Sequence, residues 1–185
     1  MTRLLSSATL LVALLTVAAS QAAEQSESPV YLGGQAIVRF RAKVEGGFLI
    51  VQATHEPGWH SYAMDNELRA AEKLAGKPSL GIEQGVVITV KSGGDVSPPW
   101  YQSAPHDLSK PELRWYTWGF DKEAIFACKR GPAGSEPVEL QIRGQACNGK
   151  SCRSFNVELT APPSASTGQQ PAFSTDDLVQ VRSQE

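Results

Sequence analysis

The sequence predicts an all-β fold, an antiparallel β-sandwich with a short helical insertion. Short segments in which apolar and polar residues alternate recur along the chain, and clusters of Gly and Pro separate them. Near the end of the chain, two of these segments flank a turn that is bracketed by cysteines. Six or seven short strands with turn residues between them are typical of a sandwich of two sheets.

The first 22 residues have the features of a secretory signal peptide. Arg3 supplies a positive charge, an apolar run follows at 4–17, and the small residues Ser20 and Ala22 have the spacing of a cleavage site. The apolar run is shorter than the roughly 20 residues of a membrane span, so no stable membrane insertion is expected after cleavage. We therefore expect a periplasmic or secreted protein whose mature part begins with a polar leader at 23–29.

The segments with strand-like alternation cover 36–44, 48–54, 86–91, 124–129, 138–146 and 153–160, and pairs of Gly or Pro, including Pro98-Pro99, punctuate the chain between them. A helix is predicted over 67–74, because Leu68, Ala71 and Leu74 repeat at helical spacing before Gly76. Residues 30–161 should therefore form one domain. The segment that follows is rich in Pro, Ser, Gly and Gln, which predicts a flexible tail at 162–185.

Composition and motifs exclude several classes of function. The chain of 185 residues has 17 basic and 19 acidic residues and a formal net charge of −2. It lacks the clusters of Lys and Arg that nucleic acids or anionic membrane surfaces require, so no nucleic-acid partner is expected. The sequence also has no G-x-S-x-G, no H-E-x-x-H and no Gly-rich phosphate loop after a strand, and it gives no support to a hydrolase.

Two cysteines, Cys147 and Cys152, flank the short turn at 148–151. Its Asn-Gly pair between alternating segments is a strong hairpin signal. Cysteines that face each other across a hairpin lie about 4.5 to 5.5 Å apart at Cα, within reach of a disulfide. An oxidising compartment favours this pairing and leaves Cys128 single. Because a disulfide that closes so short a loop adds little stability, we expect the pair to be kept for its chemistry.

Two segments carry a resemblance to a known family. The segment 141–159, QIRGQACNGKSCRSFNVEL, resembles the last hairpin of the N-terminal domain of the thiol:disulfide interchange protein DsbD family, and the segment 55–62, HEPGWHSY, is similar to the G-W-H-x-Y segment of that family. The resemblance covers about 30–162. It implies an immunoglobulin-like periplasmic fold for the sandwich.

The resemblance also implies a redox function. In such domains the paired cysteines relay electrons from a membrane-embedded partner, through a thioredoxin-like domain, to oxidised periplasmic proteins. This implies a protein-disulfide reductase or interchange component active in electron transport and cytochrome c biogenesis. Cys152 would be the sulfur that joins partners in a mixed disulfide, and Cys147 would resolve it. Lys150 and Arg153 beside the pair are candidates for lowering a thiol pKa. The expected partner is a separate thioredoxin-like or membrane thiol–disulfide exchange protein.

Members of the family carry an aromatic cap loop that covers the disulfide until a partner displaces it. The segment 113–120 lies near the equivalent place and contains four aromatic residues. The resemblance therefore implies that the disulfide is shielded by one of these rings, and the candidates are Trp115, Tyr116, Trp118 and Phe120.

Other interpretations remain open from the sequence alone. The disulfide could be a static staple, and the sandwich a non-catalytic adaptor that docks another envelope protein. The two cysteines, the three histidines and Met64 could form a copper site, since sulfur and imidazole suit Cu(I), although the cysteine spacing favours this only weakly. We expect no cofactor. Cys128 lies in an apolar segment and is expected to be a small buried hydrophobe.

Overall fold

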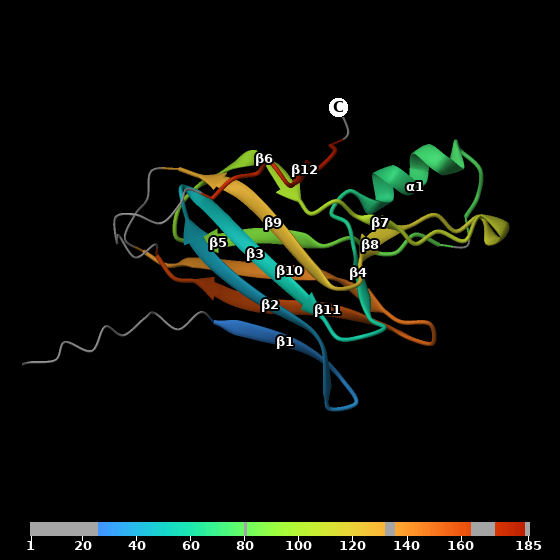
Figure 1. Ribbon diagram of the computed structural model, residues 1–185, viewed down its shortest axis with the longest axis horizontal. Coiled ribbons are helices and arrows are strands. Elements are labelled where there is room, and N and C mark those ends of the chain that lie inside the picture. The colour runs from blue at the N-terminus through green and yellow to red at the C-terminus, as the bar shows by residue number, and fades with distance from the viewer. Residues whose placement is uncertain (1–25, 80, 132–135, 164–172, 184–185) are drawn as a thin grey trace, which may run out of the picture.

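The protein is an immunoglobulin-like sandwich of two antiparallel β-sheets with one short helix, which confirms the expected fold class (Figure 1). The computed structural model describes residues 26–79, 81–131, 136–163 and 173–183. The expected signal peptide at 1–22 lies outside the described residues. No described helix has the length and apolar character needed to cross a membrane.

The first sheet has the strand order β1-β2-β3-β9-β6-β12. Its strands are β1 (Glu27–Leu32), β2 (Gln35–Glu45), β3 (Phe48–His55), β9 (Glu123–Arg130), β6 (Val96–Gln102) and β12 (Val179–Gln180). The second sheet has the order β11-β10-β4-β8-β7, and β5 also pairs with β10. Its strands are β11 (Cys152–Ala161), β10 (Val138–Cys147), β4 (His60–Tyr62), β8 (Trp118–Phe120), β7 (His106–Asp107) and β5 (Val87–Ser92). A 3-10 turn, η1 (Pro111–Leu113), precedes β8.

Aromatic pairs connect the two sheets through the core. Phe40 of β2 packs against Phe155 of β11 with ring centroids 5.3 Å apart, and Phe120 of β8 meets Phe126 of β9 edge to face at 5.5 Å. Each such ring contributes about 1.5–3 kcal/mol through burial. Gly144, opposite Phe155, leaves room for this ring, because a Cβ at that position would lie 2.8 Å from Phe155 Cζ. The core therefore fixes how β10 and β11 sit on the first sheet.

Cys128 of β9 lies in this core and is fully buried. Burial raises the pKa of its thiol to about 12. The interpretation of Cys128 as a small hydrophobe is confirmed, since a thiol with so high a pKa holds almost no thiolate at neutral pH.

The helix α1 (Asn66–Leu74) matches the predicted helix, but its buried face differs from the expected one. Asn66, Ala70 and Leu74 are the buried residues, whereas Ala71 is exposed. The helix ends where Ala75 adopts a left-handed conformation, with φ of 48°. In Figure 1, α1 and the β7–β8 segment lie at the same end of the molecule as the β10–β11 turn.

Strands also form where the sequence predicted none. β1 begins at Glu27, inside the expected polar leader, and pairs with β2. β6 contains Pro98 and Pro99, a pair that from the sequence predicts a break between strands. The register of β6 against β9 shifts between Ser97 and Trp100, so the two prolines, which cannot donate a ladder hydrogen bond, are left out of the pairing.

The expected flexible tail is wrong for its described part at 173–183. Val179 and Gln180 form β12, which pairs with β6. Phe173 lies against Phe48 with ring centroids 5.3 Å apart, and the backbone N–H of Arg182 donates to the Asp65 carboxylate at 3.2 Å. Phe173 is thus near one end of the first sheet and Arg182 beside α1, so this segment runs along the sandwich (Figure 1). The residues rich in Pro, Ser, Gly and Gln lie at 162–171, and the contacts are made by residues that follow them, to which the prediction of a flexible tail was extended.

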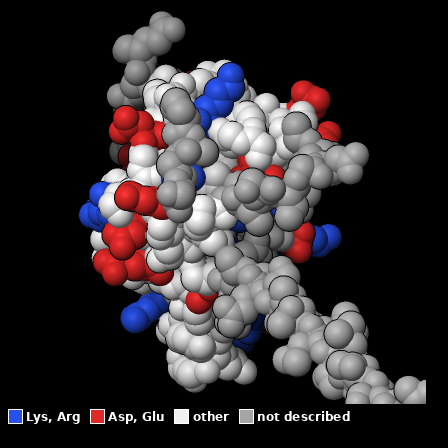
Figure 2. All heavy atoms as spheres, turned by 90° about the vertical axis from the view of Figure 1, so that its left-hand side faces the viewer, with Lys and Arg blue, Asp and Glu red and all other residues white. Residues whose placement is uncertain are grey.

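The face shown in Figure 2 carries both acidic and basic side chains. Several acidic groups gather near one margin of this face, and the basic groups stand apart from one another.

Candidate functional site

The β10–β11 hairpin carries the disulfide at its tip. The two strands pair without interruption from Val138 opposite Ala161 to Cys147 opposite Cys152. The sulfurs are bonded at 2.04 Å, and the two Cα atoms are 4.0 Å apart, closer than the expected separation. The predicted hairpin and its disulfide are therefore present.

The turn itself differs from a two-residue Asn-Gly turn. Its four residues, 148–151, are closed by a hydrogen bond from Asn148 N–H to the Ser151 carbonyl at 2.9 Å. The Asn148 side-chain oxygen accepts two more bonds at 2.8 Å, from the backbone N–H groups of Lys150 and Ser151. Gly149 has no left-handed backbone and an added Cβ would meet nothing within 4 Å. The Asn side chain holds the turn, as in an Asx turn.

The two cysteines are exposed to different degrees. Cys147 is only 2% exposed, whereas Cys152 lies at the surface. Thiol–disulfide exchange begins when a thiolate approaches one sulfur in line with the S–S bond. The exposure of the two residues therefore favours attack at Cys152 over attack at Cys147.

His60 is the neighbour of Cys147 on the other side. β4 lies between β10 and β8, and its register places His60 directly opposite Cys147. Residues directly opposite each other in an antiparallel pair point to the same face, with Cβ atoms about 4.5–5.5 Å apart. Cys152, Cys147 and His60 therefore form one row across three strands. The sequence alone suggests only a metal-ligand role for His60, because nothing local connects it to the distant cysteines.

The ring of His60 packs on Tyr62, two residues along the same strand. The ring centroids are 5.3 Å apart in a T-shaped arrangement, and His60 Nε2 lies 3.2 Å from the Tyr62 hydroxyl. Burial lowers the pKa of His60 and raises the pKa of the fully buried Tyr62. At neutral pH the imidazole is therefore neutral and the phenol keeps its proton.

His55 has a structural role. Its Nδ1–H donates to the Lys122 carbonyl at 2.7 Å, so its Nε2 accepts from the Ser61 hydroxyl at 2.8 Å. Burial lowers the pKa of His55, which keeps this tautomer uncharged. Among the described residues, no three His, Cys, Asp or Glu side chains gather as a metal site.

The four aromatic cap candidates lie in different surroundings. Trp118 and Phe120 belong to β8 and pack against or within the core. Trp115 is half-buried and lies under the Lys110 ammonium, which is 5.0 Å from the centre of the ring. Tyr116 is also half-buried. Since Phe120 is opposite Ser61 and Ser61 is opposite the core residue Ala146, Phe120 lies on the opposite face from Cys147.

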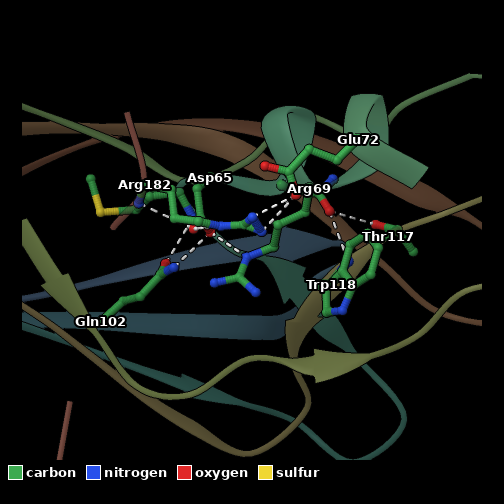
Figure 3. Close-up of polar contacts among 9 residues, drawn as sticks. Asp65, Arg69, Glu72, Gln102, Thr117, Trp118 and Arg182 are labelled. Atoms are coloured by element: carbon green, nitrogen blue, oxygen red, sulfur yellow. Dashed lines mark hydrogen bonds and ion pairs between the residues drawn. The ribbon is translucent and has the colours of Figure 1, made fainter. Parts of the chain in front are cut away.

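Asn66, at the start of α1, holds this aromatic segment in place. Its side-chain oxygen accepts from the backbone N–H of Trp118 at 2.7 Å and from the Thr117 hydroxyl at 3.1 Å (Figure 3). Its amide donates to the Glu83 carbonyl at 2.9 Å. Gly119, next in the segment, allows close approach to β4, since an added Cβ would lie 2.1 Å from the Ser61 carbonyl oxygen. The backbone of residues 117–119 is therefore held by Asn66 of α1 on one side and by β4 on the other.

Asp65 precedes Asn66 and anchors the same region. Its carboxylate accepts hydrogen bonds from Arg69 Nε at 2.8 Å, Gln102 Nε2 at 2.7 Å and the Arg182 backbone N–H at 3.2 Å (Figure 3). Burial by itself would raise the pKa of Asp65, but these bonds outweigh burial and lower it. The carboxylate thus joins α1, β6 and the C-terminal segment.

The predicted charge partners of the disulfide, Lys150 and Arg153, are both exposed. Lys150 lies in the turn, and Arg153 is opposite Ala146 in the ladder. Both are near Cys152 in the sequence, but Arg153, opposite the core residue Ala146, points to the other face of the hairpin from Cys152.

Comparisons with known proteins give likenesses to solved structures. No family model matches the chain, and no curated protein does. One similar structure is the reduced N-terminal domain of DsbD from Neisseria meningitidis, at 12% identity, covering 77% of this chain and 89% of that chain, with a TM-score of 0.48. The N-terminal periplasmic domain of ScsB from Proteus mirabilis has 17% identity, 76% and 54% coverage and a TM-score of 0.49.

A third structure is a complex of the DsbD and PilB N-terminal domains from Neisseria meningitidis, at 15% identity, covering 68% of this chain and 88% of that chain, with a TM-score of 0.43. Since all three TM-scores are below 0.5, these likenesses carry no weight for function, which has to be argued from the residues of this chain. The hairpin motif resembles that of the DsbD N-terminal domain, and the solved structures similar to this chain include N-terminal domains of DsbD and ScsB.

Proposed function

We propose that this chain is an exported thiol–disulfide exchange module that passes electrons between its Cys147–Cys152 disulfide and a thioredoxin-like or membrane thiol–disulfide exchange protein. The observation that carries the proposal is the unequal exposure of the pair, with Cys152 at the surface and Cys147 only 2% exposed. A staple needs no such asymmetry. A relay needs one accessible sulfur and one protected resolving sulfur.

Exchange at this site takes two steps. A partner thiolate attacks Cys152 Sγ, the bond to Cys147 breaks, and Cys147 leaves as a thiolate that takes up a proton. The second partner thiol, as its thiolate, then attacks the partner sulfur of the mixed disulfide, and Cys152 leaves with the electron pair. The partner is oxidised and the hairpin is reduced. The same steps in reverse transfer the two electrons to an oxidised partner.

We infer that Lys150, in the turn beside Cys152, favours the Cys152 thiolate, since nearby cations favour the ionised form of a thiol. Arg153 is adjacent in the sequence but lies opposite Ala146 in the ladder, so its charge acts from the other face of the hairpin. Since both side chains are exposed, solvent screens them and their effect is modest. The motif resemblance of the hairpin supports a thioredoxin-like partner.

Trapping of mixed disulfides tests the proposal. In the C147A variant the resolving thiol is missing, so Cys152 should accumulate a mixed disulfide with a partner of the native compartment. We expect far less adduct with C152A, because Cys147 is buried. C128A is the matched control, since its thiol lies in the core. The measurement is non-reducing electrophoresis after acid quenching, with identification of the attached protein.

Three outcomes would decide against the proposal. Equal trapping by C147A and C152A would refute the assigned roles of the two cysteines. Trapping by neither variant would favour the static staple. An attached protein without a redox-active cysteine pair would refute the partner class.

A further inference from the structure

Packing alone does not explain why a histidine, His60, lies beside the buried Cys147. Half-buried positions in strands are more often occupied by apolar or β-branched residues than by histidine. Here the imidazole is placed directly opposite Cys147 by the register of β4 on β10. Of the two cysteines of the disulfide, Cys147 is the one that solvent reaches least, so we look for the partner in its proton exchange among the neighbouring side chains.

The environment of His60 leaves its ring able to accept a proton. In the tautomer in which Nε2–H donates to the Tyr62 oxygen at 3.2 Å, the Nδ1 nitrogen carries no proton and can accept one. Burial lowers the pKa of His60, and nearby charges act in both directions. The titratable and charged groups that act on it are Tyr62 on the same strand, His55 of β3, Glu83, Lys110 and Asp121, with Cys147 of β10 opposite.

We propose that His60 accepts the proton of the Cys147 thiol when Cys147 resolves a mixed disulfide at Cys152. The inference rests on the proposed exchange function and adds a residue to it. The proton moves from Cys147 Sγ to the imidazole, and the Cys147 thiolate attacks Cys152 Sγ. The Cys147–Cys152 bond forms, the bond from Cys152 to the partner breaks, and the partner sulfur leaves with the electron pair. In the opposite direction, protonated His60 returns the proton to the departing Cys147.

The test measures how fast the pair closes at different pH values. The reduced protein is mixed with oxidised glutathione, which forms a mixed disulfide at the accessible Cys152, and the release of the second glutathione reports the attack by Cys147. The H60Q variant cannot accept a proton but retains a polar side chain beside Tyr62. H106Q is the matched control, because His106 is an exposed histidine on β7.

We expect H60Q to slow closure by about tenfold at pH 7, toward the lower end of what general acid–base groups contribute. The wild-type rate should show an inflection below about pH 6.5, the ordinary value for histidine. In H60Q only the thiol inflection near about pH 8.5 should remain. Wild type and H60Q should converge at high pH, where solvent deprotonates Cys147 without help. H106Q should follow the wild type throughout.

A role in packing alone predicts a different result. If H60Q is as fast as H106Q, or is slowed by the same factor at every pH, His60 handles no proton and the inference is wrong. If H60Q does not fold, the wild-type profile decides: a single inflection near about pH 8.5 overturns the inference. Trapping of a partner by C147A is read independently, so a failed partner search with an altered H60Q profile would refute the partner and leave His60 in place. If wild-type glutathione adducts never close, both proposals fail.

Discussion

Asp65 shows how one buried carboxylate can join three segments of a small sandwich. Its side chain is fully buried, and its three hydrogen-bond partners come from α1, β6 and the C-terminal segment. A buried charge is tolerated only when paired and hydrogen-bonded, and removing one partner of such a group costs much more than an exposed ion pair contributes. The neighbouring Asn66 hydrogen-bonds Thr117 and Trp118, so holding Asp65 in place also holds the aromatic segment.

We predict that D65N lowers the free energy of unfolding by about 3 kcal/mol at pH 7, because Arg69 loses its charged partner. The folded pKa of Asp65 lies below its ordinary value of 3.8. Its contribution is therefore fully present above about pH 4 and is lost as the pH falls through the folded pKa. The difference between wild type and D65N should shrink below about pH 4 in urea titrations.

The control for this prediction is E72Q. Glu72 forms an exposed ion pair with Arg182 at 2.6 Å, and such pairs contribute about 0–1 kcal/mol. A D65N effect as small as that of E72Q, or one that stays constant down to pH 2, would contradict the assigned role of Asp65.

The aromatic segment before and within β8 divides into two parts. Trp118 and Phe120 pack against the core, whereas Trp115 and Tyr116 precede the strand and are half-buried. The shield that the family resemblance implies should therefore come from Trp115 or Tyr116. A ring fixed in the core could not move aside for a partner without exposing apolar surface.

We predict that truncating Trp115 or Tyr116 to Ala, at one of the two positions at least, speeds reduction of the disulfide by glutathione several-fold. Access to the sulfur is one of the factors that set exchange rates. Reduction by the cognate protein partner should change much less, because the partner displaces the shield. The measurement is the rate of appearance of free thiols.

Truncation of Trp118 or Phe120 provides the contrast. Removing a fully buried aromatic ring costs about 3–5 kcal/mol, so F120A should lose stability first, and W118A, whose ring is half-buried, should lose less. Unchanged glutathione rates in both W115A and Y116A would show that neither ring shields the disulfide.

Long-range pairing explains which features of the molecule could be predicted from the sequence. The alternation in β2, β3, β9, β10 and β11 is long enough to be visible, and the cysteines bracket their own hairpin. β4 and β8 have three residues each, too few for alternation to show, yet they place His60 and the aromatic segment. The pairing of β12 with β6 depends on Val179 and Gln180 meeting a strand far away in the chain, which no local pattern reveals.

The disulfide contributes less to the stability of the whole fold than the packing between the two sheets. It closes a loop with a sequence separation of only 5, whereas the cross-sheet pairs Phe40–Phe155 and Phe120–Phe126 join distant parts of the chain. In the chain-entropy description so short a loop contributes about 2 kcal/mol, compared with about 3 kcal/mol for a loop of 15 residues. The sandwich core should therefore persist without the bond.

We predict that reducing the disulfide lowers Tm by no more than about 10 °C, since 1 kcal/mol corresponds to about 3–5 °C for a domain of this size. Unfolding should stay cooperative, followed by circular dichroism with and without reductant. The C147A/C152A double variant should melt near the reduced protein, which separates loss of the bond from effects of the reductant. A reduced protein that is unfolded at 25 °C would mean that the bond is a structural staple, and a relay could then not alternate between its two redox states while keeping the surface that its partner binds.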